Sequence, residues 1–339
     1  MSRLPFASPW LLAPMEGVTD PVFRRLVLGL HGPDQLGGAF TEFLRVSVHR
    51  RTEKDIQRHL GPITSPIPVG VQLMGSDAQL LAETARAAVR IGAPLLDLNF
   101  GCPAKGALQG CAGASLLQDP LAMERLVAAV RQAVDDESGG TVPTSAKIRA
   151  GYEHAERVED LARAVEAGGA DLLTVHCRTR AEGYCKEVDW SRLARAAASV
   201  SIPVCGNGGI ERYADFEALR EQTGCAFAMV GRGALGDPWI FAGRQATTEA
   251  CARFLVEYAE AMLETGNVTL RGAAGRVKQL LRLWTAGDLV PTEAARQSWL
   301  SESDPARLLA RLREYLGGES VLGAAASGLH DFLDGAQPA

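Results

Sequence analysis

The chain has 339 residues and a formal net charge of −5 at pH 7, with 47% hydrophobic and 22% charged residues. These values are ordinary for a globular protein, and the length favours one large domain with a smaller one. The net charge gives no overall indication of a nucleic-acid ligand, so such a partner would have to bind a locally basic surface. Because no apolar run is long enough for a signal peptide or a membrane span, we expect a cytoplasmic protein without a membrane partner.

The cysteines argue against a disulfide framework and against a zinc site. There are seven of them, which is an odd number, and no two have C-x-x-C spacing. This pattern fits a protein that stays in a reducing compartment. We therefore expect free thiols and no bound metal.

Short apolar stretches alternate with amphipathic ones through most of the chain. The expected strands are Trp10–Met15, Ala39–Phe43, Pro68–Met74, Leu95–Asn99, Thr144–Arg149, Leu172–Cys177, Pro203–Asn207 and Phe227–Gly231. The expected helices between them are Asp20–Leu30, Asp77–Ile91, Pro120–Val134, Ala155–Ala167, Trp190–Val200 and Tyr213–Gln222. This number of units over this length is typical of a (β/α)₈ TIM barrel in the α/β class. The alternative, a doubly wound open sheet, lacks its G-x-G-x-x-G fingerprint after the first strand.

The sequence changes character after about Arg244, where no further strand-like run occurs. The remaining expected elements are all helices: Ala250–Glu264, Gly275–Trp284, Thr292–Leu300 and Asp304–Leu316. We therefore expect two domains, a TIM barrel over residues 1–245 and a small helical domain over residues 246–339.

Polar or glycine residues follow all eight expected strands, where a TIM barrel carries its active site. One of them is Cys102, which follows the fourth strand and precedes a glycine-rich loop. Taken alone, Cys102 is better explained as a small buried core residue. Lys147, by contrast, lies within an apolar strand, where an unpaired cation is costly to bury. The polar and glycine residues after the eight strands, taken together, therefore favour an active site over a purely structural role in packing.

The glycines after the last two strands indicate the class of ligand. Gly206, Gly208 and Gly209 follow the seventh strand, and Gly231 precedes Arg232 after the eighth. Barrels often bind phosphate on backbone N–H groups in this position. A lysine in the barrel mouth would then stabilise negative charge on a ring system, as a reduced flavin requires.

The chain resembles the tRNA-dihydrouridine synthase family in several segments. These are LAPMEGVTD (12–20), VQLMG (71–75), DLNFGCPAK (97–105), AKIRAG (146–151), VHCRTR (175–180), GNGGI (206–210) and MVGRGAL (229–235). The motif N-x-G-C-P before a Gly/Ala-rich loop is specific to that family when it stands between the other segments. TEFLRV (41–46) and RAEGYCKEVDW (180–190) are more similar to the bacterial branch that modifies uridine 16 than to those acting on uridines 17 or 20.

The resemblance implies an FMN enzyme that uses NADPH to reduce the C5–C6 double bond of a uridine in the tRNA D-loop. Cys102 would be the acid that protonates C5. The residues implied to bind FMN are Pro14, Met15, Glu16, Gln72, Lys147, His176, Asn207, Gly208, Gly209, Gly231 and Arg232. The residues implied to hold the uridine or contact tRNA are Arg45, Asn99, Arg149 and Tyr184. We expect a monomeric enzyme with tRNA as its partner.

A basic stretch in the expected helical domain is consistent with RNA binding. Residues 268–287 contain no acidic residue. Their basic residues are Arg271, Arg276, Lys278 and Arg282. On a helix Lys278 and Arg282 share one face, and Arg276 lies nearby, so we expect Arg276 and Lys278 to contact phosphates. Taken alone, the cluster is better explained as a solvated helix face.

Three alternatives remain open from the sequence. The same chemistry would act at another D-loop uridine (17, 20 or 20a), or the chain would be a small-molecule FMN oxidoreductase of the dihydroorotate dehydrogenase type. It would otherwise be an RNA-binding protein without catalysis on a barrel scaffold. Cys111, in the loop after Cys102, is also an alternative proton donor.

Overall fold

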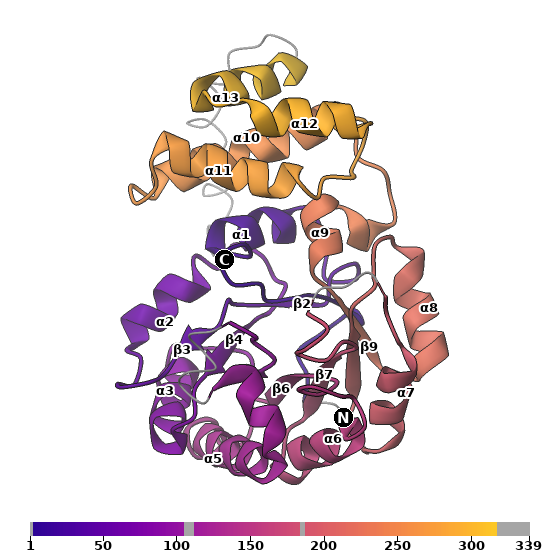
Figure 1. Cartoon of the computed structure of the whole chain (residues 1–339). Helices are drawn as coiled ribbons and strands as arrows, with labels where there is room; N and C mark the ends of the chain where they lie inside the picture. Colours follow the sequence, from indigo (N-terminus) through magenta and orange to yellow (C-terminus); the bar gives the residue numbers. More distant parts are fainter. Residues whose placement is uncertain (1–2, 105–111, 184–186, 317–339) are drawn as a thin grey trace, which may run out of the picture. The chain divides into compact units, whose positions relative to one another are not determined.

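The computed structural model describes residues 3–104, 112–183 and 187–316. The chain divides into two compact units, Met1–Gln245 and Ala246–Ala339. The first unit contains the strands and the second contains helices (Figure 1). In the described part of the chain no helix is both long and apolar enough to cross a membrane.

Parallel strands form the centre of the first unit. They are β1 (Trp10–Leu12), β2 (Gly38–Phe40), β3 (Leu44–Arg45), β4 (Val69–Met74), β5 (Leu96–Phe100), β6 (Thr144–Arg149), β7 (Leu172–His176), β8 (Val204–Asn207) and β9 (Phe227–Val230). Their order is β2-β1-β9-β8-β7-β6-β5-β4-β3, and a further pairing of β2 with β4 closes the ring. The TIM barrel expected from the sequence is therefore confirmed.

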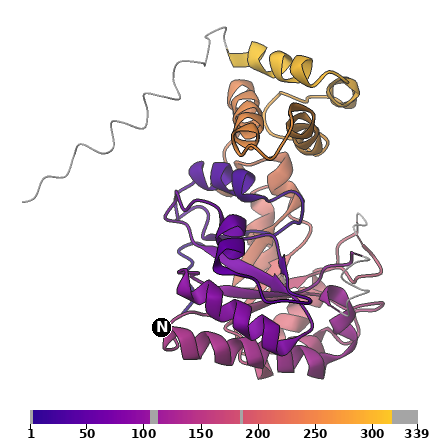
Figure 2. The same cartoon turned by 90° about the vertical axis from the view of Figure 1, so that its left-hand side faces the viewer.

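Helices cover the outside of the strands (Figures 1 and 2). They are α1 (Pro21–Gly29), α2 (Glu53–Leu60), α3 (Ala78–Arg90), α5 (Pro120–Ser138), α6 (Val158–Ala167), α7 (Ser191–Ala198), α8 (Ala214–Thr223) and α9 (Arg232–Gly236), with 3₁₀ turns η1 (Gly113–Gln118) and η2 (Ile240–Ala242). The starts of α1, α3 and α5 follow from their N-caps, because Asp20, Asp77 and Asp119 each accept a backbone N–H of the first turn.

The expected second strand, Ala39–Phe43, is interrupted in the structure. β2 pairs with the start of β4, and the separate strand β3 pairs with its end. Between them the Thr41 hydroxyl accepts the Gln72 N–H at 3.0 Å, so a side chain replaces one ladder hydrogen bond. This break lets the chain turn outward, and α2, which the sequence analysis did not predict, follows it.

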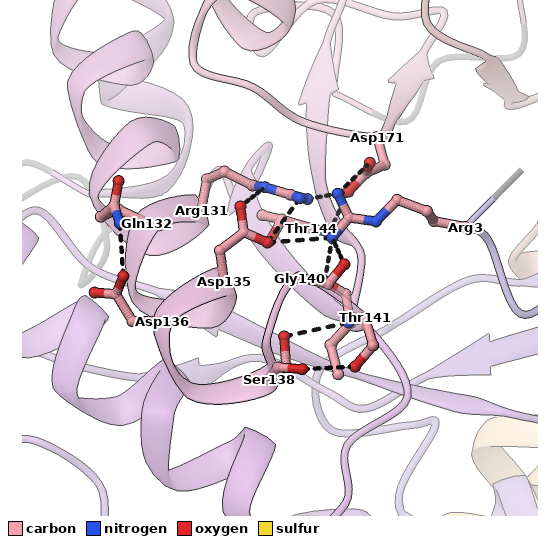
Figure 3. Close-up of polar contacts among 11 residues, drawn as sticks. Arg3, Arg131, Gln132, Asp135, Asp136, Ser138, Gly140, Thr141, Thr144 and Asp171 are labelled. Carbon is pink, nitrogen blue, oxygen red and sulfur yellow. Dashed lines mark hydrogen bonds and ion pairs between the residues drawn. The ribbon is translucent and has the colours of Figure 1, made fainter.

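An ion-pair network lies at the amino-terminal end of the barrel strands (Figure 3). Arg131 of α5 makes two hydrogen bonds of 2.8 Å to Asp135 and an ion pair to Asp171, just before β7. Asp171 also accepts the backbone N–H of Thr144 at 2.9 Å, and Arg3 reaches both carboxylates. Because the strands are parallel, this network lies at the end opposite the strand termini that carry the candidate site.

The second unit is built from α10 (Thr248–Glu264), α11 (Leu270–Leu281), α12 (Glu293–Ser301), α13 (Pro305–Arg313) and the 3₁₀ turn η3 (Glu314–Leu316). Its core includes Trp284 and Trp299, which are both almost fully buried. α11 begins five residues before the expected Gly275, because Thr269 caps it by accepting the Gly272 N–H. Glycines at 272 and 275 made this first turn a weak helix prediction from sequence.

Candidate active site

Cys102 lies just beyond the end of β5, and its backbone is held in place from two sides. The side-chain oxygen of Asn99 accepts the N–H groups of Gly101 and Cys102, both at 2.9 Å. The Cys102 carbonyl accepts the Ala114 N–H at 3.0 Å. The thiol packs against Met74 and is 8% exposed. Burial raises the pKa of Cys102, and nearby Glu16 adds to that effect, so the thiol keeps its proton at neutral pH.

A buried chain of hydrogen bonds orients Asn99 from behind. The Asn99 amide donates to the Gln72 oxygen at 2.8 Å, and the Gln72 amide donates to Asp97 at 2.7 Å. Ser145 donates to the other oxygen of Asp97 at 2.6 Å. Burial raises the pKa of Asp97 to about 6. Asp97 and Ser145 were missed in the sequence analysis, although an acid within the apolar run Leu95–Leu98 was a usable signal.

Gln72 and Asn99 were expected to face the flavin and the uridine. The structure brings them together beside Cys102 and engages both ends of the Gln72 amide within the protein, where Gln72 is fully buried. Asn99 remains partly exposed at the end of its strand. Gln72 therefore acts on the site through Asn99, whereas Asn99 is accessible from the barrel mouth.

Arg149, also expected to hold the uridine, is 3% exposed at the end of β6. Its guanidinium donates to the carbonyls of Gly101 at 2.8 Å, Thr179 at 3.1 Å and Gly183 at 3.3 Å. These bonds join the loop that carries Cys102 to the loop after β7. Arg149 thus holds the backbone at Gly101, next to Cys102, against the loop after β7.

Lys147 and His176 bring cationic and polar character to the barrel interior. Among the described residues the Lys147 ammonium has no hydrogen-bond partner, and burial lowers its pKa to about 8, with Arg149 adding to the effect. Burial and the neighbouring cations hold the pKa of His176 well below its usual value. Its Nδ1 accepts the Arg178 N–H at 3.2 Å, so the neutral ring carries its proton on Nε2. Both groups are therefore suited to face an anionic or hydrogen-bond-accepting ligand.

The loops after β8 and β9 carry glycines where a side chain would crowd the protein itself, since a Cβ at Gly208 would stand 2.7 Å from the Cys177 sulfur. Gly208 and Gly209 have φ values of 113° and 81°, which residues with side chains rarely adopt. A side chain at Gly231 would stand 3.1 Å from the Met15 sulfur, so these two expected flavin-binding residues lie together. The Asn207 amide donates to the Met229 carbonyl at 2.7 Å and joins β8 to β9 just before these loops. Arg232 begins α9 directly after Gly231.

The β1–α1 loop, which contains Pro14, Met15 and Glu16, is held by two side chains. Thr19 accepts the Met15 N–H at 2.7 Å. Glu42 accepts the N–H groups of Gly17 and Val18, the latter at 3.2 Å, and burial raises the pKa of Glu42. The sequence analysis assigned Glu42 no role, and nothing in its spacing indicated that it reaches this loop.

The expected tRNA-contacting residues fall in three places. Arg45 is exposed in β3 and lines a cavity that reaches Met74. Arg276 lies on α11, where its guanidinium is 3.4 Å from the Gln279 oxygen. Lys278 donates to the carbonyls of Leu300, at 2.9 Å, and Glu302. Its ammonium is thus already bound within the helical unit. Tyr184, like Cys111 and Cys185, lies outside the described residues.

No group of three or more potential metal ligands occurs in residues 3–104, 112–183 and 187–316. The groups described above are a protonated thiol after β5, a lysine on the adjacent strand β6 opposite Asn99, and two glycine-rich loops after β8 and β9. Such an arrangement can transfer a proton to a substrate and stabilise negative charge on a bound cofactor.

Comparisons with known proteins identify the family of the chain. The family profile described as dihydrouridine synthase (Dus) matches residues 11–273. A protein of Pseudomonas syringae pv. tomato named tRNA-dihydrouridine(16) synthase is 38% identical over 81% of this chain and 89% of its own length. Proteins of the same name from Cupriavidus necator and Vibrio vulnificus are 40% and 41% identical, over 71% and 67% of this chain and 72% of each relative. The chain belongs to the dihydrouridine synthase family and is an enzyme of the oxidoreductase class.

Proposed function

We propose that this enzyme reduces the C5–C6 double bond of uridine 16 in the D-loop of tRNA, with FMN as cofactor and NADPH as electron donor. The observation that carries the proposal is the protonated thiol of Cys102, fixed at the end of a barrel strand near Lys147. The names of the relatives support the choice of tRNA and of position 16.

The residues around the barrel mouth fit FMN. The unpartnered ammonium of Lys147 can pair with the negative charge of a reduced isoalloxazine ring, and neutral His176 can donate a hydrogen bond from Nε2. The glycine loops at 208–209 and 231 suit the phosphate end, because they follow the last two barrel strands, where barrels often bind phosphate on backbone N–H groups. When bound and reduced, FMN supplies the hydride that C6 of the uracil ring accepts.

Cys102 completes the reduction by giving its thiol proton to C5. A raised pKa suits this role, because a thiol that stays protonated at neutral pH is a proton donor rather than a nucleophile. Asn99 and Arg149 fix the Gly101–Cys102 backbone and thereby aim the thiol. The target uridine must leave its stack to reach this depth in a barrel.

The helical unit supplies basic groups for binding the tRNA backbone. Arg271 and Arg282 are exposed on or next to α11, and Arg276 is partly exposed. Because Lys278 is engaged with two carbonyls, we base this part of the proposal on the three arginines. Phosphate contacts of this kind position an RNA without reading its sequence.

The proposal is tested by anaerobic spectroscopy of the purified protein with FMN. NADPH should bleach the flavin absorbance, and unmodified tRNA should restore it, with dihydrouridine appearing in the same molar amount. A flavin that is reoxidised by small enones or quinones but not by tRNA would instead indicate a small-molecule oxidoreductase. A protein that binds tRNA but cannot be loaded with FMN would contradict the proposed reaction.

A further inference from the structure

A cavity of about 490 Å³ opens beside the candidate active site, between the β3–α2 region and the end of β4. Its inner wall includes Met74, the residue that packs against the Cys102 thiol. Its outer wall carries Arg45, Arg51 and Arg58. The cavity is therefore separated from the reacting group by the Met74 side chain, and its lining carries three arginines against two acids, Glu16 and Asp55.

The basic wall is a built part of the fold. Arg24 of α1 is 1% exposed and donates to the carbonyls of His59 and Leu60, which anchors the carboxyl end of α2. Arg51 donates through Nε to the Arg45 carbonyl at 2.6 Å. These bonds fix the backbone of the segments that carry Arg45 and Arg58.

The charges in this wall favour an anion. Arg58 has a side chain that is 71% exposed, and its nearest carboxylate, Asp55, is 3.8 Å away. Asp55 already accepts the N–H and hydroxyl of Thr52, at 3.1 and 2.8 Å, as part of the capping box that starts α2. Burial lowers the pKa of His59, and the cations of Arg24 and Arg51 lower it further, which reflects a positive local potential.

We infer that this cavity binds a backbone phosphate of the RNA strand next to the reacting uridine, and that Arg58 is one of its ligands. The inference rests on the proposed function and extends it, because it assigns an RNA-binding role to α2. A guanidinium suits phosphate recognition because its planar N–H groups match the phosphate oxygens. The position next to Met74 fits a nucleotide whose neighbouring base has been turned toward Cys102.

The test compares Arg58→Gln and Arg58→Glu with wild type and with a matched control, Arg163→Gln. Arg163 lies on α6, has a side chain that is 59% exposed, and pairs with the carboxylate three residues earlier, as Arg58 does. The probe is unmodified tRNA, and the measurements are its dissociation constant at several salt concentrations and the rate of flavin reduction by NADPH without tRNA.

We expect Arg58→Gln to weaken tRNA binding roughly three- to tenfold and to lower the slope of log affinity against log salt by about 1. Arg58→Glu should weaken binding further, whereas Arg163→Gln should match wild type. Unchanged tRNA affinity and salt slope in both Arg58 variants would overturn the inference while leaving the enzyme a tRNA reductase. If Arg58→Glu instead slowed flavin reduction by NADPH, the cavity would be assigned to a dinucleotide phosphate. Failure of wild type to reduce tRNA at all would contradict the proposed function itself.

Discussion

At the scale of single residues, the state of the Cys102 thiol decides its chemistry. Nucleophilic cysteines usually have a lowered pKa, whereas burial and the nearby Glu16 carboxylate raise that of Cys102. The same residue type is therefore set up here to release a proton only to a strongly basic carbon, such as C5 of a uracil ring that has gained a hydride.

Replacement of Cys102 by Ala should leave FMN and tRNA binding intact and slow dihydrouridine formation about 10²–10⁴-fold, the usual contribution of a general acid. Single-turnover reoxidation of the reduced flavin by tRNA measures this step directly. Cys225→Ala, which removes a buried thiol elsewhere in the barrel, should leave the rate close to that of wild type. Full activity of the Cys102 variant would exclude Cys102 as the acid and direct attention to Cys111.

The lowered pKa of Lys147 leads to a prediction of how FMN binding depends on pH. Its pKa in the free protein is lowered to about 8, so the cation that attracts the flavin is lost as the pH rises through that value. The FMN affinity of the flavin-free protein should therefore fall between pH 7 and pH 9.5. In Lys147→Arg the charge persists over this range, and its affinity should stay flat. Titration by flavin fluorescence quenching checks both proteins, and identical profiles would contradict this role of Lys147.

At the scale of elements, the ends of β4, β5 and β6 share one hydrogen-bond chain. It runs from Ser145 through Asp97 and Gln72 to Asn99, and ends on the Cys102 N–H. Gln72, Asp97 and Ser145 are directly paired across the three adjacent strands, so the chain transmits the register of those strands to the position of one thiol.

Asp97→Asn should disturb this chain, because the new amide would place a donor opposite the Gln72 amide. We expect the rate of dihydrouridine formation to fall roughly tenfold to hundredfold through misplacement of the thiol, with little change in the rate of flavin reduction by NADPH. Ser145→Ala removes only the far hydrogen bond and should have a smaller effect on the same rate. Equal effects on both half-reactions would indicate general damage to the barrel rather than loss of alignment.

Asp97 also contributes to the pH dependence of stability. Its pKa is raised to about 6 in the folded protein from an ordinary value near 3.8, so the folded state binds the proton more tightly. The resulting stabilisation is complete below about pH 4 and is lost as the pH rises through about 6. The stability difference between wild type and Asp97→Asn should therefore change across this window and be constant above it, as measured by thermal unfolding at fixed ionic strength.

The sequence was sufficient to predict the barrel, because apolar strands and capped helices alternate with a regular period. It was also sufficient to predict that Cys102, Lys147, His176 and the glycine loops gather at one end of the strands. It did not predict the break at Thr41, because that break depends on a side chain replacing a ladder hydrogen bond. The helix α2 was missed although its capping box, Thr52 with Asp55, was a usable local signal. Likewise, the sequence did not predict that Arg149 and Gln72 make their hydrogen bonds within the protein, because their partners lie far away in the sequence.

At the scale of the whole molecule, stability and chemistry reside at opposite ends of the barrel. The network of Arg131, Asp135 and Asp171 lies at the amino-terminal ends of the strands (Figure 3). The side chains of Arg131 and Asp171 are only 13% and 20% exposed, so their interaction is shielded from solvent more than most pairs on this protein. Conserving the fold and performing the reaction thus depend on different residues.

Asp171→Ala should therefore destabilise the protein by about 1–3 kcal/mol, because it removes the acceptor of a charged hydrogen bond and of the Thr144 N–H. The thermal midpoint should fall by several degrees while turnover per folded molecule stays unchanged. Asp160→Ala is the control, since its carboxylate is 51% exposed and pairs with two exposed arginines. That change should lower stability by less than about 1 kcal/mol.

Substitutions in the helical unit should weaken tRNA binding without changing the rate of flavin reduction. Replacing Arg271, Arg276 and Arg282 together by Gln should weaken tRNA binding and lower its salt dependence, because up to three phosphate contacts are lost. Flavin reduction by NADPH should not change. Retention of wild-type tRNA affinity by the triple variant would show that this stretch is only a solvated helix face.

The most direct test of the central claim is to map dihydrouridine by mass spectrometry in tRNA from a strain that lacks this gene. The account predicts that position 16 loses the mass increment of two hydrogens, and that the wild-type gene restores it whereas the Cys102→Ala gene does not. Loss at another D-loop position would keep the reaction and correct its site. Unchanged tRNA, in a strain with no second enzyme for that position, would contradict the account.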